Sequence, residues 1–170
     1  ARRVTAAEAG SIFIARPVDG SDPNILRACS LQNDKIDIET DNFTIPIDMT
    51  SIAGYVAKTR EILELDDVYE VPSDKPFMFN RSFDDKHGYR SKSMLAFPLK
   101  NFNGRVIGVV QLLNHLEGTD DVGNPLYRPF PLHLVDDMKS IMTVLGVMVE
   151  RVDLLSEISR LRTEVERLRA

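Results

Sequence analysis

Residues 93–114 read SMLAFPLKNFNGRVIGVVQLLN and contain the strongest pattern in the chain. Two apolar runs, residues 93–99 and 106–113, flank Asn103-Gly104, a dipeptide that favours a tight hairpin turn because both residues readily adopt positive φ. The second run has apolar residues on both of its faces, which is typical of a central strand covered on each side. This stretch therefore predicts an antiparallel hairpin at the centre of a sheet, with helices or long loops packed against both faces.

The residues before this hairpin predict further strands and one short helix. Runs rich in β-branched and aromatic residues predict strands at 11–16, 25–31, 43–47 and 62–65. Thr50 or Ser51 caps a short helix that runs to about Thr59. Residues 1–9 are interpreted as the end of a helix whose beginning lies outside the chain. Residues 66–91 and 117–131 are polar with little periodicity, and a connection as long as 66–91 is usually functional.

The C-terminal residues 132–170 contain no proline and predict one continuous helix. Its first half has the apolar spacing of a helix packed on a sheet, at Val135, Met138, Ile141, Met142, Leu145 and Val149. Its second half changes to a heptad repeat, with a residues Ile158 and Val165 and d residues Leu154, Leu161 and Leu168.

The charges beside this heptad favour a parallel, two-stranded coiled coil. Glu157 and Glu164 fall at g positions, and Arg162 and Arg169 fall at the e positions five residues later. Opposite charges would therefore face each other between two chains, and β-branched a residues with leucine at d also favour two strands. Because only two full heptads are present, an amphipathic helix that docks on its own domain is the open alternative.

Several motifs in the right order give the chain a resemblance to GAF domains. Residues 9–14 look like the first strand of that family, and residues 45–47 with 51–61 are similar to its second-helix motif. Residues 90–99 followed by 108–114 look like its last hairpin. The resemblance is greatest to the GAF domains of cyclic-nucleotide phosphodiesterases, bacterial adenylyl cyclases and related sensors. It implies an α+β fold in residues 1–150: a six-stranded antiparallel sheet with helices on both sides, followed by a coiled-coil signalling helix in 151–170.

The resemblance also implies a small-molecule pocket between the sheet and the crossover segment. In members that bind cyclic nucleotides, the ligand meets the first strand, the end of the second strand, the crossover and the last strands. The matching residues, which we expect to bind a ligand, are Ser11, Gln32, Asn33, Asp84, His87, Ser91 and Gln111. Their hydroxyl, amide and carboxylate groups suit a polar heterocycle.

One family motif is altered in this chain. The family carries Asn-Lys…Phe…Asp-Glu, in which a lysine–aspartate pair ties the last strand to the terminal helix. Here the matching residues are Asn114-His115, Phe130 and Asp136-Asp137. A charged His115 could still pair with Asp136, but only in part near neutral pH. This departure weakens the expectation of a cyclic nucleotide and leaves the expected fold unchanged.

Composition excludes several other classes of function. The 170 residues carry 21 basic and 26 acidic side chains, and a net charge of -5 gives no broad attraction to nucleic acid or to an anionic membrane. The single cysteine, Cys29, excludes a disulfide framework and a thiolate metal cluster, and its apolar neighbours predict that it is buried and inert. No histidine spacing predicts a metal site, and no apolar run approaches the roughly 20 residues that cross a bilayer.

These observations together predict a non-catalytic regulatory domain of a cytoplasmic signalling protein. We expect a small-molecule ligand, such as a cyclic nucleotide, no cofactor or metal, no nucleic-acid or membrane partner, and a homodimer through the terminal helix. The whole protein would then carry a kinase, cyclase, phosphodiesterase or other output domain. The alternatives are a GAF domain that binds no ligand and serves as a dimerisation spacer, and, from another class, an enzyme.

Overall fold

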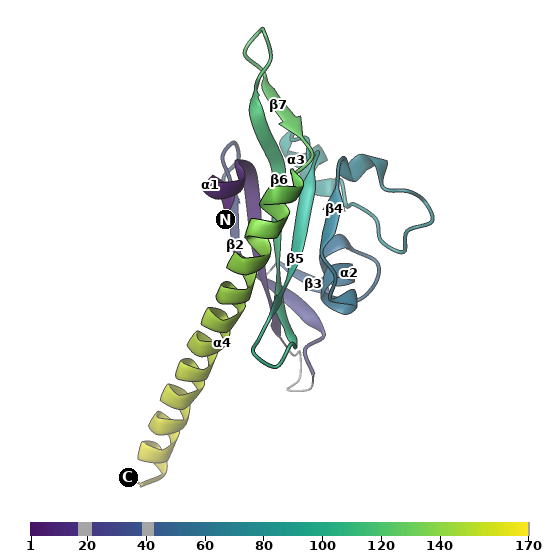
Figure 1. Cartoon of the computed structure of the whole chain (residues 1–170). Helices are drawn as coiled ribbons and strands as arrows, with labels where there is room; N and C mark the ends of the chain where they lie inside the picture. Colours follow the sequence, from purple (N-terminus) through teal and green to yellow (C-terminus); the bar gives the residue numbers. More distant parts are fainter. Residues whose placement is uncertain (17–21, 39–42, 170) are drawn as a thin grey trace.

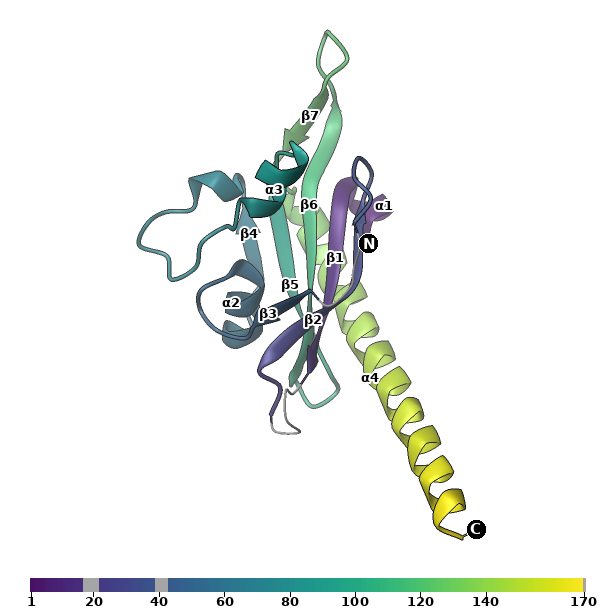
Figure 2. The same cartoon turned by 180° about the vertical axis from the view of Figure 1, so that it is seen from behind.

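The computed structural model describes residues 1–16, 22–38 and 43–169. A curled antiparallel sheet lies between two short helices on one side and one long helix on the other (Figures 1 and 2). The elements in chain order are α1 (Arg2–Thr5), β1 (Ala7–Arg16), β2 (Ile25–Asn33), β3 (Thr44–Pro46), α2 (Ile52–Thr59), β4 (Leu63–Leu65), the 3-10 turn η1 (Val68–Glu70), α3 (Ser82–His87), β5 (Met94–Lys100), β6 (Val106–Thr119), β7 (Pro125–Arg128) and α4 (Leu132–Arg169).

The predicted six-stranded sheet is confirmed, in the order β3-β2-β1-β6-β5-β4. Strand β6 lies between β1 and β5, and every strand pair is antiparallel. The central place predicted for residues 106–113 is therefore correct. Pro46 lies in the edge strand β3, where the missing backbone N–H costs no hydrogen bond within the sheet.

Two predictions about the ends of strands were wrong. The polar residues 117–131 are not only a connection, because β6 continues to Thr119 and pairs with a seventh strand, β7. The first strand begins at Ala7 rather than Ser11, because the N-terminal helix ends at Thr5 and Ala6 adopts a left-handed φ of 47°. Alanine propensity alone predicted helix through residue 9, and pairing with β6 overrode it.

Two hydrophobic cores lie on the two faces of the sheet. The core under α2 contains Phe13, Leu26, Val56, Phe77 and Val109, each at most 2% exposed. The core under α4 contains Leu95, Phe97, Leu99, Leu112 and Met138, also at most 1% exposed. Alternate side chains of β5 and β6 enter opposite cores, which is why both strands are apolar on both faces. Ser51 caps α2 by accepting a hydrogen bond from the Gly54 backbone N–H at 3.1 Å, as predicted for Thr50 or Ser51.

Cys29 is exposed, so the prediction of a buried thiol was wrong. The register between β1 and β2 shifts between Ile12 and Phe13, which pair with Ser30 and Ala28. Cys29 is therefore the extra residue of a β-bulge, which breaks the alternation that would have turned it inward. Residues 17–24 contain two prolines, a glycine and two aspartates, a composition that predicts a turn, but residues 17–21 lie outside the described part of the chain.

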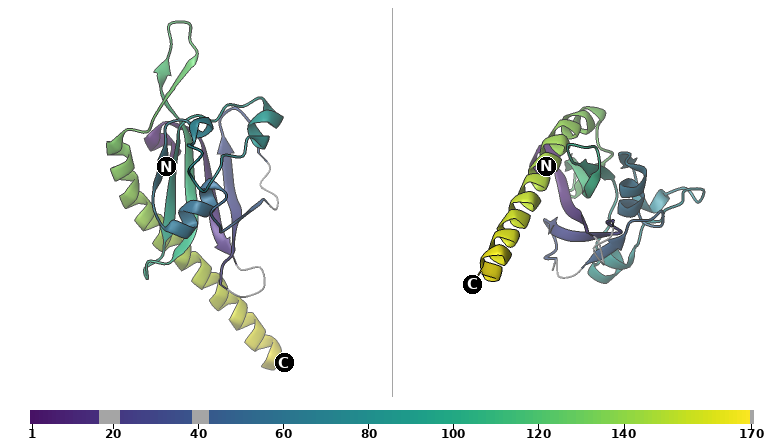
Figure 3. Two further views of the ribbon diagram at one scale, coloured as in Figure 1. Left: turned by 90° about the vertical axis from the view of Figure 1, so that its right-hand side faces the viewer. Right: turned by 90° about the horizontal axis from the view of Figure 1, so that it is seen from below.

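Helix α4 is continuous over 38 residues, about 57 Å at 1.5 Å per residue. Its first half packs on the sheet and buries Val135, Met138 and Met142. Its second half leaves the sheet and extends beyond the end of the domain (Figure 3). The apolar residues there are exposed, so the alternative of a helix docked on its own domain is wrong.

Candidate functional site

Three of the predicted ligand-binding residues lie on the face of the sheet that α2 covers. Ser11 on β1 pairs directly with Gln111 on β6, and on its other side with Leu31 on β2. Asn33 lies two residues beyond Leu31 on the same strand, so its side chain points to the same face. This face therefore carries a row of hydroxyl and amide groups across three neighbouring strands.

Gln111 has unused hydrogen-bonding capacity on this face. The residue is 9% exposed, and its Nε2 donates only a weak contact of 3.7 Å to the sulfur of Met94. Within the described residues, this contact to Met94 is the one hydrogen bond that the Gln111 side chain makes. Asn33 is similar: Oδ1 accepts from the Lys35 backbone N–H at 2.8 Å, but the buried Nδ2 has no partner within the described chain.

Asp84 and Ser91 are brought together, but as partners of each other. The Asp84 carboxylate accepts hydrogen bonds from the Ser91 backbone N–H at 2.7 Å, from the Ser91 hydroxyl at 2.9 Å and from the Tyr69 hydroxyl at 3.0 Å. Asp84 is 2% exposed and Ser91 equally buried. These bonds fix α3 against the start of β5, a structural role that sequence alone did not distinguish from ligand contact.

Gln32 and His87 do not join the other predicted residues. Gln32 precedes Asn33 on β2, so its side chain points to the opposite face of the sheet, and it is exposed. His87 lies on the surface of α3, where its ring packs on Phe83 with the centroids 4.4 Å apart. His87 Nδ1 also donates to the Phe83 carbonyl oxygen at 2.9 Å.

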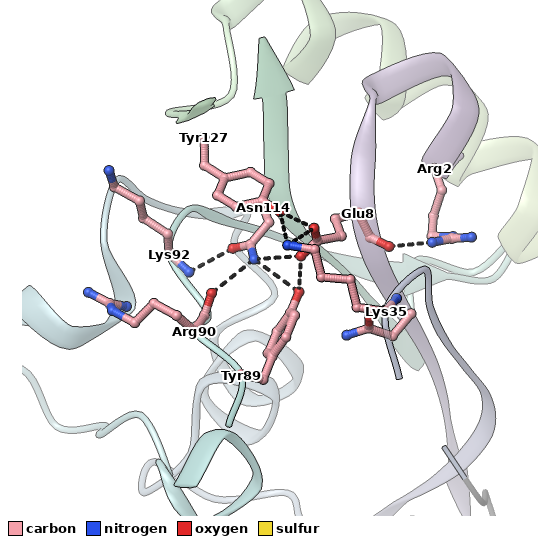
Figure 4. A network of polar contacts seen from close by, with 9 residues as sticks. Arg2, Glu8, Lys35, Tyr89, Arg90, Lys92, Asn114 and Tyr127 are labelled. Atoms are coloured by element: carbon pink, nitrogen blue, oxygen red, sulfur yellow. Dashed lines mark hydrogen bonds and ion pairs between the residues drawn. The ribbon is translucent and has the colours of Figure 1, made fainter. Parts of the chain in front are cut away.

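A buried carboxylate that the sequence did not reveal lies at the centre of a network of polar contacts (Figure 4). Glu8 on β1 is 8% exposed. It accepts hydrogen bonds from Tyr89 Oη at 2.6 Å, from Asn114 Nδ2 at 3.1 Å and from Tyr127 Oη, and Lys35 Nζ lies 2.9 Å from its Oε2. These five residues, the Glu8 network, come from β1, the segments after β2 and α3, and strands β6 and β7.

The Glu8 network shifts the pKa values of its members. Burial raises the pKa of Glu8, but the hydrogen bonds from Tyr127, Tyr89, Lys35 and Asn114 outweigh it and hold the pKa below its usual 4.5. Burial, together with the hydrogen bond to Glu8, raises the pKa of Tyr89. Glu8 is therefore ionised and both tyrosines are protonated at neutral pH, which favours a stable set of charge-assisted hydrogen bonds.

Asn114, the asparagine of the altered motif, has a structural role in this chain. Its φ of 58° is a left-handed conformation that asparagine tolerates better than most residues. Its side chain accepts from the Lys92 backbone N–H at 2.7 Å and donates to the Arg90 carbonyl oxygen at 3.0 Å. Asn114 therefore holds the end of the crossover segment against β6.

His115 does not form the contact that its place in the motif suggested. Its Nδ1 donates to the Thr5 carbonyl oxygen at 2.8 Å, and its ring lies 5.4 Å from that of Phe130. Asp136, the expected partner, is instead bound by Lys139 at 2.7 Å. The histidine therefore ties the last strand to the N-terminal turn rather than to α4.

The crossover segment also contains a stacked arginine cluster. The guanidinium carbons of Arg81 and Arg90 lie 4.1 Å and 3.7 Å from the centre of the Tyr69 ring. Arg90 also binds the Asp67 carboxylate at 2.7 Å and 2.8 Å. Burial raises the pKa of Asp67, but the hydrogen bonds from Arg90 and the Tyr69 backbone N–H outweigh burial and hold this pKa below its usual value. None of the seven predicted ligand-binding residues is an arginine, whereas this cluster places two arginines on the crossover segment.

A shallow depression of about 400 Å³ opens beside the end of β2. Its lining consists of Arg2, Leu31, Gln32, Asn33, Ile36, Asp37 and Ile38. It includes two of the seven predicted ligand-binding residues, and the other five do not line it. Within residues 1–16, 22–38 and 43–169, no group of three or more histidine, cysteine or acidic side chains could hold a metal ion. In the same residues, no helix is both long and apolar enough to span a membrane.

This architecture is that of a small regulatory sensor domain: a curled antiparallel sheet, a crossover segment over one face and a long outgoing helix on the other. The sequence pattern of the GAF domain family matches residues 1–149, and the chain belongs to this family. GAF domains are sensor domains of signalling proteins, and the fold predicted from the motifs is confirmed.

Individual relatives agree with this assignment. The chain is 26% identical over 157 residues to a cGMP-specific 3',5'-cyclic phosphodiesterase of Drosophila ananassae, a match that covers 89% of this chain and 12% of the phosphodiesterase. Among solved structures, a methyl-accepting chemotaxis protein (residues 122 to 287) matches with a TM-score of 0.66 and 21% identity, covering 91% of this chain and 84% of that one. The GAF domain of an Acinetobacter phosphoenolpyruvate-protein phosphotransferase matches with a TM-score of 0.64 and 12% identity, covering 92% and 78%.

Proposed function

We propose that this GAF domain is a non-catalytic sensor that binds a small polar molecule, such as a cyclic nucleotide, on the α2 face of its sheet. The ligand-binding groups are Ser11, Asn33 and Gln111, with the crossover segment closing over them. The observation that carries the proposal is the buried Asn33 Nδ2, which has no partner within the described residues, together with the Gln111 amide, whose Nε2 makes only the weak contact to Met94. A buried polar group without a full set of partners is costly unless a ligand or water completes it.

The spacing of these groups suits a ligand the size of a nucleotide. Gln111 and Asn33 are separated by two strand spacings across the sheet and by two residues along it. At about 4.8 Å per strand and 3.3 Å per residue, this separation is about 12 Å. The similarity to a phosphodiesterase named for cGMP supports this choice of ligand class.

The seven predicted residues have different roles in this proposal. Asp84 and Ser91 hold the crossover segment in place through their mutual hydrogen bonds and are not among the ligand-binding groups. Gln32 and His87 lie outside the proposed site. Arg81 and Arg90, stacked on Tyr69, are the crossover groups that would favour an anionic ligand.

Helix α4 would transmit the signal out of the domain. In this proposal, the α4 helices of two chains form a parallel coiled coil, and the protein is cytoplasmic. The apolar a and d residues between Leu154 and Leu168 are each at least 45% exposed. The a and d positions continue toward the domain at Val144 and Val147, which are 55% and 46% exposed. The repeat therefore spans more than three heptads, and Arg151 is the one polar residue at its a and d positions. Residues 1–150 would then be the sensor and 151–170 the relay. The free-energy difference that the ligand must create between two helix arrangements is about 1–3 kcal/mol.

Ligand binding is tested by thermal shift and calorimetry with cyclic AMP, cyclic GMP and a panel of metabolites. Gln111→Met removes the amide and keeps the length of the side chain, while Gln32→Met makes the same change on the opposite face. We expect Gln111→Met to weaken binding by about tenfold, the effect of one lost hydrogen bond, and Gln32→Met to leave it unchanged. Equal effects of the two variants would contradict the site.

If no compound of the panel binds, the alternative of a GAF domain that serves only as a dimerisation spacer is favoured. The dimer itself is tested by sedimentation equilibrium of Leu161→Asp, which places a charge at a d position. Ser159→Asp, at an outward b position of the same helix, is the control. If Leu161→Asp associates as tightly as Ser159→Asp, the heptad interpretation fails.

A further inference from the structure

The turn between β5 and β6 is fastened to α4. Glu150 on α4 accepts hydrogen bonds from Asn101 Nδ2 at 2.9 Å and from the Phe102 backbone N–H at 3.2 Å. One turn earlier, Gly146 lies so close to the end of β5 that an added Cβ would be 2.1 Å from the Lys100 carbonyl oxygen. Two hydrogen bonds and a close backbone approach therefore hold the hairpin turn against this part of the helix.

Phe102 is the most exposed large hydrophobic residue in the described part of the chain. Its side chain is 87% exposed, although its own backbone is fixed beside Glu150. A phenyl ring held in water on a tethered turn is costly, because none of its apolar area is removed from solvent. The heptad position of Glu150 indicates which group could cover the Phe102 ring.

Glu150 occupies a g position when the heptad is extended toward the domain, because it lies seven residues before Glu157. In a parallel dimer, a g residue faces the e residue five positions later in the other chain. The later g residues, Glu157 and Glu164, face Arg162 and Arg169, which have the opposite charge. Glu150 faces Leu155 instead, which is apolar and 57% exposed.

The charge pattern thus changes at the heptad where the domain meets the helix. Glu150 is already hydrogen-bonded to its own hairpin turn, so it needs no arginine opposite. The apolar group that the same turn presents beside it is Phe102. An apolar e residue in the partner is the complement of an apolar group on this side of the seam.

We propose that Phe102 of each protomer packs on Leu155 of the partner subunit. The inference rests on the proposed parallel dimer and deepens it, because it adds a contact between the sheet of one protomer and the helix of the other. Strand β6, which carries Gln111, leads directly from this turn. A shift of β6 on ligand binding would therefore reach the helix of the partner as well as its own.

The first test compares two exposed apolar residues on two hairpin tips. Phe102→Ser removes the proposed contact, and Val122→Ser makes a similar change on the β6–β7 hairpin, where Val122 is 84% exposed. Each contact occurs twice in a two-fold dimer. We therefore expect Phe102→Ser to raise the dimer dissociation constant by about tenfold or more in sedimentation equilibrium, and Val122→Ser to leave it unchanged.

A double-mutant cycle and a cross-link identify the partner residue. Leu155→Ser should weaken the dimer as Phe102→Ser does, and the double variant should be no weaker than the single variants by more than about twofold. In a Cys29→Ser background, a chain with both Phe102→Cys and Leu155→Cys should form an interchain disulfide on mild oxidation, and each single cysteine should not.

The outcomes separate this inference from the proposed function. A stable dimer in which Phe102→Ser behaves like Val122→Ser, and in which the cysteine pair stays reduced, overturns the contact and leaves the coiled coil intact. A wild-type chain that stays monomeric at all concentrations overturns both. A weakened Phe102→Ser dimer with unchanged circular dichroism and an interchain cross-link supports the contact.

Discussion

Gly146 is the position where substitution should reveal how tightly α4 is held to the sheet. An alanine Cβ would lie 2.1 Å from the Lys100 carbonyl oxygen and 3.0 Å from its carbonyl carbon. Backbone cannot give way as a flexible side chain would, so the helix must move away by about 1 Å or more. That movement also stretches the two hydrogen bonds between Glu150 and the hairpin turn.

The expected sign is opposite to that of an ordinary helical glycine. Gly→Ala in a free helix stabilises by about 1 kcal/mol. Here the overpacking costs about 1–3 kcal/mol, and the weakened bonds to Glu150 cost about 1 kcal/mol more. The net effect is a loss of about 2 kcal/mol, which lowers the Tm of a chain of this size by about 4–8 °C.

Thermal denaturation followed by circular dichroism measures this effect, with Ser159→Ala on the free half of α4 as the control. Ser159→Ala gains helix propensity without a new contact, so its Tm should be equal to or slightly above that of the wild type. Hydrogen exchange should show faster exchange at residues 101–105 in Gly146→Ala only. A Gly146→Ala variant as stable as Ser159→Ala, with unchanged exchange in the turn, would refute the close packing of α4 on Lys100.

Two further predictions concern the buried carboxylates. Because the folded pKa of Glu8 lies below 4.5, its stabilisation is present above the unfolded-state pKa and is lost as the pH falls through the folded pKa. Glu8→Gln should therefore reduce the free energy of unfolding by about 1–3 kcal/mol at pH 7, and the difference from the wild type should shrink below about pH 4.5. Urea titrations of both proteins at pH 7 and pH 3.5 measure this difference. A difference that does not depend on pH would contradict the Glu8 network. Asp84→Ala leaves the buried Ser91 N–H and hydroxyl without their acceptor, so it should reduce the free energy of unfolding by about 2–4 kcal/mol in the absence of any ligand. A variant with wild-type stability would contradict the structural role and favour ligand contact as the role of Asp84.

The strands, the capped helix α2 and the long helix α4 could be predicted because each depends on local pattern. Alternation along residues 93–99 and 106–113, with Asn103-Gly104 between them, specifies a hairpin whatever packs on it. The lack of proline after residue 131 and the change from helical spacing to a heptad likewise depend only on neighbours in the chain. Of the seven residues taken from the family resemblance, three share the proposed binding face.

The Glu8 network could not be predicted, because its members come from five separate segments. Glu8 and Asn114 are 106 positions apart, and an acidic residue among alanines gives no signal that it is buried. Only the asparagine of the altered motif pointed to this part of the sheet. The bulge that exposes Cys29 depends in the same way on how β2 registers with β1.

Local sequence patterns set the period of each element, and therefore the antiparallel sheet, the capped helix and the heptad. Which polar groups bind one another and which stay without a partner depends on the packing of the whole chain. Asp84 and Ser91 use their hydrogen bonds on each other, while the buried Asn33 Nδ2 has no partner among the residues that the structure describes. The physical reason is that periodicity is set within a few residues, whereas hydrogen-bond satisfaction depends on which distant segments the packing brings within about 3 Å.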